Sequence, residues 1–261
     1  MPRFCAHLGY LFTELPLEER FGAAREVGFS AIEHPAPYEF GVTAFRDAAQ
    51  AHGLTVPQIA APGGKPGSGE KGLACLPGRT GDFRDSIQKG IDAALTIGAP
   101  MLHTLAGIIP DGIAADKCRD TYLTNIAWAT EQCDKAGLRL ILEPICNEAN
   151  PGFFLNDMFL AVELIRELGE TTTGMLFDTY HAAATRVDIL TFLEGHLDII
   201  AHVQISDYPG RHEPGSATLP FDDFFRLLDH LNYPGWVGCE YKPATDTTSG
   251  LGWASEFLST S

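Results

Sequence analysis

The chain has 261 residues, 45% of them hydrophobic and 20% charged, which is enough to bury the core of a single domain. A formal net charge of −16 argues against nucleic acid as a partner, because a strongly negative surface repels a phosphate backbone. No apolar run is long enough to span a membrane, and the six cysteines are scattered without a Cys-x-x-Cys pair. We therefore expect a cytoplasmic protein with reduced thiols that binds a small molecule, with no nucleic-acid and no membrane partner. A homo-oligomer is compatible with this sequence.

Short apolar runs that are typical of buried strands alternate with amphipathic stretches along the whole chain. We predict strands at residues 3–8, 31–34, 55–60, 101–106, 138–143, 174–178, 200–204 and 236–240. The clearest helical patterns fall between them, at residues 17–27, 83–97, 159–168 and 221–231. No shift in composition marks a linker, so the pattern predicts one α/β domain over residues 1–261. A (β/α)8 barrel of the TIM type fits this repeat better than its alternative, a doubly wound open sheet.

A polar residue stands at the end of each of the last four predicted strands. These residues are Glu143, Asp178, Gln204 and Glu240. The C-terminal ends of barrel strands meet on one face, so we expect the four side chains to converge. One such carboxylate alone is commonly a helix cap or an ion-pair partner, but three together need a cation to offset their repulsion. An all-oxygen set of this kind predicts a site for Mg²⁺ or Mn²⁺.

Two histidines lie close to these strand ends. His181 follows Asp178 by three residues, and we expect it to contact a substrate or else to face solvent from a loop. His202 shares a strand face with Gln204, and we interpret it as a hydrogen-bonded core histidine rather than a ligand. His7, within the first predicted strand, is expected to line the pocket.

Two basic residues follow ligand-bearing strand ends, Arg211 and Lys242. Either side chain is a candidate for binding a substrate carboxylate, and either is otherwise a solvated surface charge. A planar guanidinium binds a carboxylate through two hydrogen bonds, which favours Arg211.

A loop rich in glycine and proline, residues 62–81, follows the third predicted strand. The segment Gly67-Ser-Gly-Glu-Lys-Gly72 matches the dinucleotide-binding fingerprint only in its letters, because Pro66 precedes it and no suitable helix follows. We expect a lid or pocket wall here, with a mobile surface loop as the alternative.

Several segments resemble the hydroxypyruvate isomerase family, and the resemblance extends over almost the whole chain. They are Glu143-Pro-Ile, Phe177-Asp-Thr-Tyr-His181, Ala201-His-Val-Gln-Ile-Ser206, Arg211-His-Glu-Pro-Gly215 and Gly238-Cys-Glu-Tyr-Lys-Pro243. This family has the xylose isomerase-like TIM barrel and includes 2-oxo-tetronate isomerase. The resemblance implies that Glu143 and Glu240 are the catalytic acid/base pair. It also implies that these two glutamates, Asp178 and Gln204 hold the metal.

The chain departs from the family at its expected pocket wall and leaves the four ligands intact. His7 stands where relatives usually carry Asn, Ile59-Ala60 replaces a His-Asn or Phe-Asn pair, and Ala217-Thr218 replaces Gly-Glu. The resemblance implies that an aldose–ketose isomerase converts a short hydroxy 2-oxo acid through an enediolate, and it favours hydroxypyruvate going to tartronate semialdehyde (2-hydroxy-3-oxopropanoate). The alternatives are a 2-oxo-tetronate isomerase, a ketose 3-epimerase and a catalytically silent metabolite-binding protein. A phosphodiester-cleaving nuclease would need more histidine ligands and a basic surface.

Overall fold

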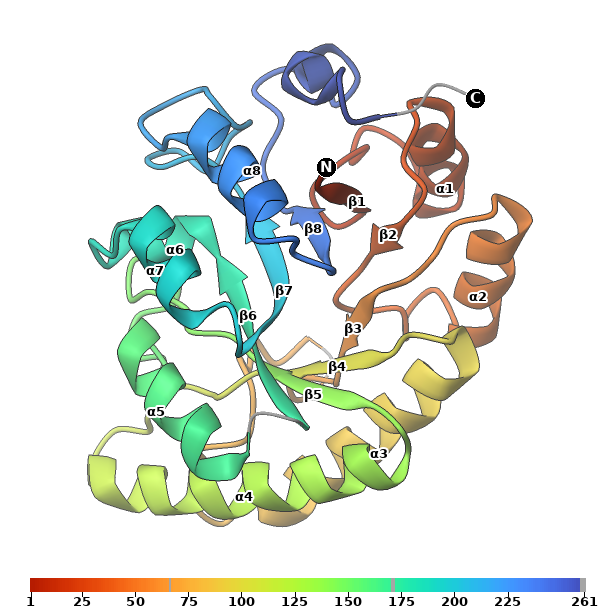
Figure 1. Cartoon of the computed structure of the whole chain (residues 1–261). Helices are drawn as coiled ribbons and strands as arrows, with labels where there is room; N and C mark the ends of the chain where they lie inside the picture. Colours follow the sequence, from red (N-terminus) through yellow and green to blue (C-terminus); the bar gives the residue numbers. More distant parts are fainter. Residues whose placement is uncertain (66, 170–171, 259–261) are drawn as a thin grey trace. The chain divides into compact units, whose positions relative to one another are not determined.

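The computed structural model describes residues 1–65, 67–169 and 172–258 of the chain (Figure 1). The sheet has eight parallel strands in the order β2-β1-β8-β7-β6-β5-β4-β3. Neighbours in this order are neighbours in the sequence, apart from β1 and β8, because each helix returns the chain to the strand beside the last one. The predicted (β/α)8 class is therefore confirmed.

Every predicted strand is present, and the four predicted helices correspond to α1, α3, α5 and α8. The strands are β1 (Arg3–His7), β2 (Ile32–Glu33), β3 (Gln58–Ala60), β4 (Met101–Thr104), β5 (Arg139–Leu142), β6 (Thr173–Asp178), β7 (Ile200–Ile205) and β8 (Trp236–Cys239). The helices are α1 (Leu17–Glu26), α2 (Val42–Ala51), α3 (Thr80–Ile97), α4 (Ala115–Lys135), α5 (Met158–Leu168), α6 (Thr179–Ala184), α7 (Ile189–His196), α8 (Phe221–His230) and the 3₁₀ helix η1 (Ser249–Ala254).

The chain divides into two compact units, and the first comprises residues 1–57, 177–197 and 202–261. In it β1 pairs with β2 on one side and with β8 on the other, and β8 also pairs with β7 (Figure 1). The register places His7 opposite Glu33, and both Ala6 and Ile205 opposite Cys239. The C-terminal ends of these four strands are therefore level with one another, which brings the side chains that follow them into one neighbourhood.

The second unit comprises residues 58–176 and 198–201. Its strands pair in the order β3, β4, β5 and the start of β6, and α3 and α4 pack along the outside of β4 and β5 (Figure 1). Ile141, Leu176 and Ala201 form an apolar cluster against Met101. The interpretation of residues 1–261 as one domain stays a prediction.

All six cysteines are buried and none forms a disulfide, as expected for reduced thiols. Within the described parts of the chain, no helix is both long and apolar enough to cross a membrane.

Candidate active site

Asp178 ends β6 and is fully buried, and its two carboxylate oxygens have different partners. Oδ1 accepts the backbone N–H of Tyr180 at 2.7 Å and so caps α6. Oδ2 accepts from Nη2 of Arg211 at 3.0 Å and lies 3.6 Å from Nε2 of His181. The same carboxylate therefore caps α6 and also contacts Arg211 and His181.

Arg211 lies between two of the predicted metal ligands. Its Nη2 donates to Glu240 Oε2 at 2.9 Å as well as to Asp178. The guanidinium carbon is 5.1 Å from the ring centre of Tyr10 and 5.1 Å from that of Tyr180, which adds cation–π attraction. The backbone of Arg211 has φ +58°, a conformation that costs a non-glycine residue roughly 1–3 kcal/mol. The fold thus holds a cationic group on these carboxylates at a conformational cost.

The charged cluster formed by Asp178, Glu240, Arg211 and His181 contains two carboxyl groups and one guanidinium. Burial, together with the negative charges of Asp178 and Glu33, raises the pKa of Glu240 to about 8 against the opposing effect of Arg211. Burial lowers the pKa of His181 to about 4, so its imidazole is neutral near pH 7. Two carboxylates that already share one guanidinium nitrogen form a donor set that fits a divalent cation.

A buried aspartate shapes the loop that carries Arg211. The carboxylate of Asp207 accepts hydrogen bonds from five backbone N–H groups at 2.8–3.0 Å, and its own carbonyl accepts the N–H of Arg211. The five groups belong to Tyr208, Gly215, Ala217, Thr218 and Leu219. Asp207 therefore fixes the path of residues 208–219 without contacting the cluster through its side chain.

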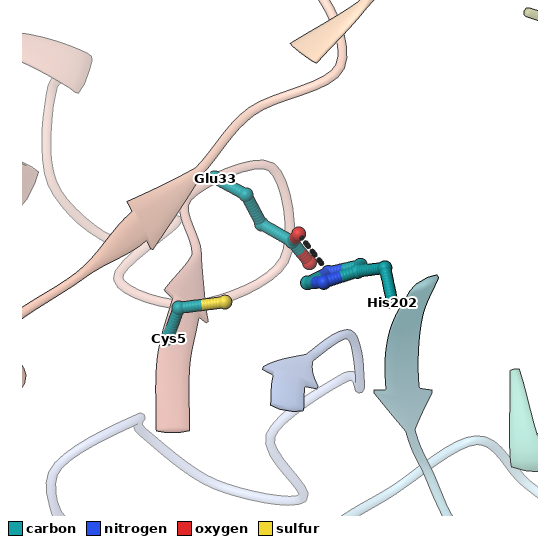
Figure 2. A group of neighbouring side chains, drawn as sticks. All are labelled: Cys5, Glu33 and His202. Atoms are coloured by element: carbon teal, nitrogen blue, oxygen red, sulfur yellow. Dashed lines mark hydrogen bonds and ion pairs between the residues drawn. The ribbon is translucent and has the colours of Figure 1, made fainter. Parts of the chain in front are cut away.

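Gln204, near the end of β7, is held by a residue that the sequence did not single out. Its Nε2 donates to Oε1 of Glu33 at 2.8 Å. Nε2 of His202 lies 2.7 Å from Oε2 of the same carboxylate (Figure 2). Burial by itself would raise the pKa of Glu33, but His202 and its hydrogen bond, with His7 and Gln204, bring it to about 2. The prediction that His202 is a hydrogen-bonded core residue is confirmed.

The other predicted substrate-binding residues differ in position. His7 is buried, with Nε2 3.6 Å from Oε1 of Glu240, and burial lowers its pKa. Lys242 is exposed, and its contacts are made by its backbone, whose N–H donates to the carbonyl of Arg211 at 2.7 Å. Their roles in substrate binding stay predictions.

Glu143 belongs to the second unit, where it directly follows β5. Its side chain is buried, and Oε2 lies 3.4 Å from Nε2 of His103. Its convergence with the other three predicted ligands stays a prediction. In the loop of residues 62–81, Glu70 accepts the N–H of Lys65 and a hydrogen bond from Arg79, both at 2.8 Å. Residue 66, at the edge of the fingerprint-like segment, lies outside the described residues.

A pocket of about 900 Å³ lies away from this cluster, along α8 and the C-terminal segment. Phe221, Arg226, Trp253 and Phe257 are among its lining residues. None of the predicted catalytic, metal-binding or substrate-binding residues lines it, so we place the candidate site at the strand ends instead.

Residues 21–259 match the family described as xylose isomerase-like TIM barrel. The chain is 38% identical to the 2-oxo-tetronate isomerase of Cupriavidus necator, over 99% of each chain. It is 33% identical to the hydroxypyruvate isomerase of Escherichia coli, over 98% of this chain and 100% of the relative. A crystal structure named AP endonuclease, family 2, from Brucella melitensis superposes with a TM-score of 0.95 at 33% identity, covering 99% of this chain and 100% of that one.

Proposed function

Because the chain belongs to the xylose isomerase-like TIM barrel family and is an isomerase, we propose that it interconverts a short hydroxy 2-oxo acid and its aldehyde isomer. Hydroxypyruvate and a four-carbon 2-oxo-tetronate are the two candidate substrates, each named by a full-length relative. The observation that carries the proposal is the cluster around Glu240: a largely buried carboxylate that shares one guanidinium nitrogen with Asp178.

The chemistry needs a base at one carbon and an acid at its neighbour. A base takes a proton from the hydroxyl-bearing carbon, giving an enediolate. An acid then returns a proton to the former carbonyl carbon, and the hydroxyl proton moves to the former carbonyl oxygen. We assign these proton transfers to Glu240 and Glu143. Glu240 enters the proposal from its place directly after β8 and from its contact with Arg211. Glu143 enters the proposal from its place after β5 and from the family resemblance of Glu143-Pro-Ile.

A divalent cation, Mg²⁺ or Mn²⁺, would be held by Asp178, Gln204, Glu240 and Glu143 in this proposal. When bound, it supplies positive charge to the substrate oxygens as they become anionic. Arg211 serves as the local counter-charge for the substrate carboxylate in a chain with a net charge of −16. The stacking of its guanidinium between two tyrosine rings limits its rotamers, so less entropy is lost when the acid binds.

A substrate panel tests the proposal: hydroxypyruvate, four-carbon hydroxy 2-oxo acids and free ketoses, each with chelator and with added Mg²⁺ or Mn²⁺. We expect turnover of an acid that chelation strongly depresses and that either cation restores without Zn²⁺. Full activity after exhaustive metal removal would contradict the metal's role. Preference for a free ketose would replace the proposal with an epimerase.

Three site variants, each with a matched surface control, test the residues. Glu143→Gln and Glu240→Gln should each lose most activity while the protein stays folded, whereas Glu26→Gln, on the exposed side of α1, should not. Arg211→Ala should raise KM for the acid far more than for any neutral sugar, and Arg226→Ala on α8 should leave KM unchanged. Near wild-type turnover in either glutamate variant would overturn the two-glutamate mechanism.

A further inference from the structure

Glu33, at the end of β2, is a fully buried carboxylate that takes no part in the proposed proton transfers. Its two oxygens are separately occupied, Oε1 by the amide nitrogen of Gln204 at 2.8 Å and Oε2 by the imidazole of His202 at 2.7 Å. The thiol of Cys5 lies close by, with its sulfur within 4.8 Å of a carboxylate oxygen of Glu33 (Figure 2). A buried charge of this kind is destabilising unless donors surround it, and an apolar side chain would fill the same space without needing them. The presence of a carboxylate here therefore needs an explanation beyond packing.

The contact with Gln204 fixes which end of that side-chain amide faces which way. A carboxylate only accepts hydrogen bonds, so it selects the NH₂ group of the amide and excludes the oxygen. Among the described residues, no donor reaches the Gln204 amide oxygen. The amide oxygen is therefore left available for another partner, and an oxygen is the atom that a hard cation requires.

Room for this arrangement comes from Gly238 on β8. A Cβ atom at that position would lie 2.1 Å from Oε1 of Glu33 and 3.0 Å from Cγ of Gln204. Any larger residue would displace the carboxylate or the glutamine. Strand β2 and the consecutive strands β7 and β8 therefore combine to bring one carboxylate onto one amide.

We propose that Glu33 is a positioning residue that holds the Gln204 amide with its oxygen available for the divalent cation. The inference rests on the proposed function, because Gln204 is a metal ligand only there. Removing a group that hydrogen-bonds to a metal ligand and orients it typically weakens metal binding by about 10- to 100-fold.

An alternative is that Glu33 is itself a ligand, since Cys5, Glu33 and His202 offer ligand atoms within 4.8 Å of one another (Figure 2). The hydrogen bond of 2.7 Å between His202 and Glu33 argues against this, because a proton occupies the line that a metal would need.

The experiment measures Mn²⁺ binding to metal-free protein by the loss of the free-ion electron paramagnetic resonance signal, with thermal unfolding recorded in parallel. Glu33→Gln should weaken Mn²⁺ binding by about 10- to 100-fold, because an amide at position 33 no longer dictates the orientation of the one at 204. Gln204→Glu alone should also bind poorly, since it places two carboxylates in contact.

The exchange variant Glu33→Gln/Gln204→Glu should recover Mn²⁺ binding to within a few-fold of wild type. The amide at position 33 can then donate to the carboxylate at position 204 while still accepting from His202. Asp188→Asn, at the exposed cap of α7, is the control and should bind Mn²⁺ as wild type does. A role of Glu33 in stability alone would lower the unfolding temperature without this pattern of loss and recovery.

A folded Glu33→Gln protein with wild-type Mn²⁺ affinity would overturn the inference. A folded exchange variant whose Mn²⁺ binding stays weak would also overturn it. This second result decides the question even if Glu33→Gln alone does not fold. A second bound cation per chain that Cys5→Ser removes would assign Glu33 as a ligand instead. If wild type itself takes up neither Mn²⁺ nor Mg²⁺, the proposed function fails and the inference with it, whereas the other outcomes leave the proposed function intact.

Discussion

The guanidinium of Arg211 should stabilise the metal-free protein, and Arg211→Met tests this by removing the charge while keeping an unbranched apolar stem. Asp178 is fully buried, and the side chains of Glu240 and Arg211 are only 14% and 13% exposed. Removing one partner of a buried ion pair costs about 3–5 kcal/mol, and the slight exposure here favours the lower end, about 3 kcal/mol. In a chain of this size that loss corresponds to about 6–12 °C in unfolding temperature.

The assay is thermal unfolding of wild type and Arg211→Met, each with chelator and with saturating Mn²⁺. We expect the deficit of the variant to shrink in Mn²⁺, because the cation then supplies the positive charge that Arg211 supplied beside Asp178 and Glu240. Arg226→Met, whose side chain is 74% exposed, is the matched control and should stay within about 0.5 kcal/mol of wild type. A deficit for Arg211→Met below about 1 kcal/mol, or one that is the same with and without Mn²⁺, would refute the reasoning.

Three further predictions concern the surrounding structure. Asp207→Asn should cost about 2 kcal/mol and expose loop amides to hydrogen exchange, since an NH₂ group cannot accept the two N–H groups now bound to Oδ2; unchanged exchange would contradict this. Gly238→Ala should cost about 1–3 kcal/mol in thermal unfolding through its clash with Glu33, and a silent substitution would show that the carboxylate moves freely. The pKa of Glu70 is lowered to about 2, chiefly by the hydrogen bond from the backbone N–H of Lys65. The stabilisation that the Glu70 carboxylate gives to the loop is thus present above the ordinary pKa of 4.5 and is lost as the pH falls through 2. Pepsin should therefore cleave Glu70→Gln faster than wild type, and this difference should vanish near pH 2.

The fold was predictable because strand and helix periodicities repeat so regularly. The strand that ends in Glu33 is shorter than predicted, since only Ile32 and Glu33 pair with β1. Asp178 was predictable as a strand-end carboxylate. Its side chain both caps a helix and pairs with Arg211, so the two alternative interpretations of such a residue apply together.

Glu33 was not predictable from its neighbourhood in the sequence. It is a single acidic residue at the end of the strand predicted at residues 31–34, and the local sequence does not show which side chains surround it. The role of Glu33 depends on its contacts with His202 and Gln204, which lie 169 and 171 residues further along the chain. Contacts at that separation are set by strand order and register, which a periodicity does not specify.

The hydrogen bonds of Asp207 also bear on how fast a ligand can be captured and on how this loop can change in evolution. Since folding already orders residues 208–219 around one carboxylate, a ligand that meets Arg211 does not have to organise the segment, and association should proceed without a slow loop-closing phase. An insertion between Tyr208 and Leu219 would pull amides away from Asp207. Adaptation of this loop to new ligands should therefore proceed by exchanging side chains at constant length.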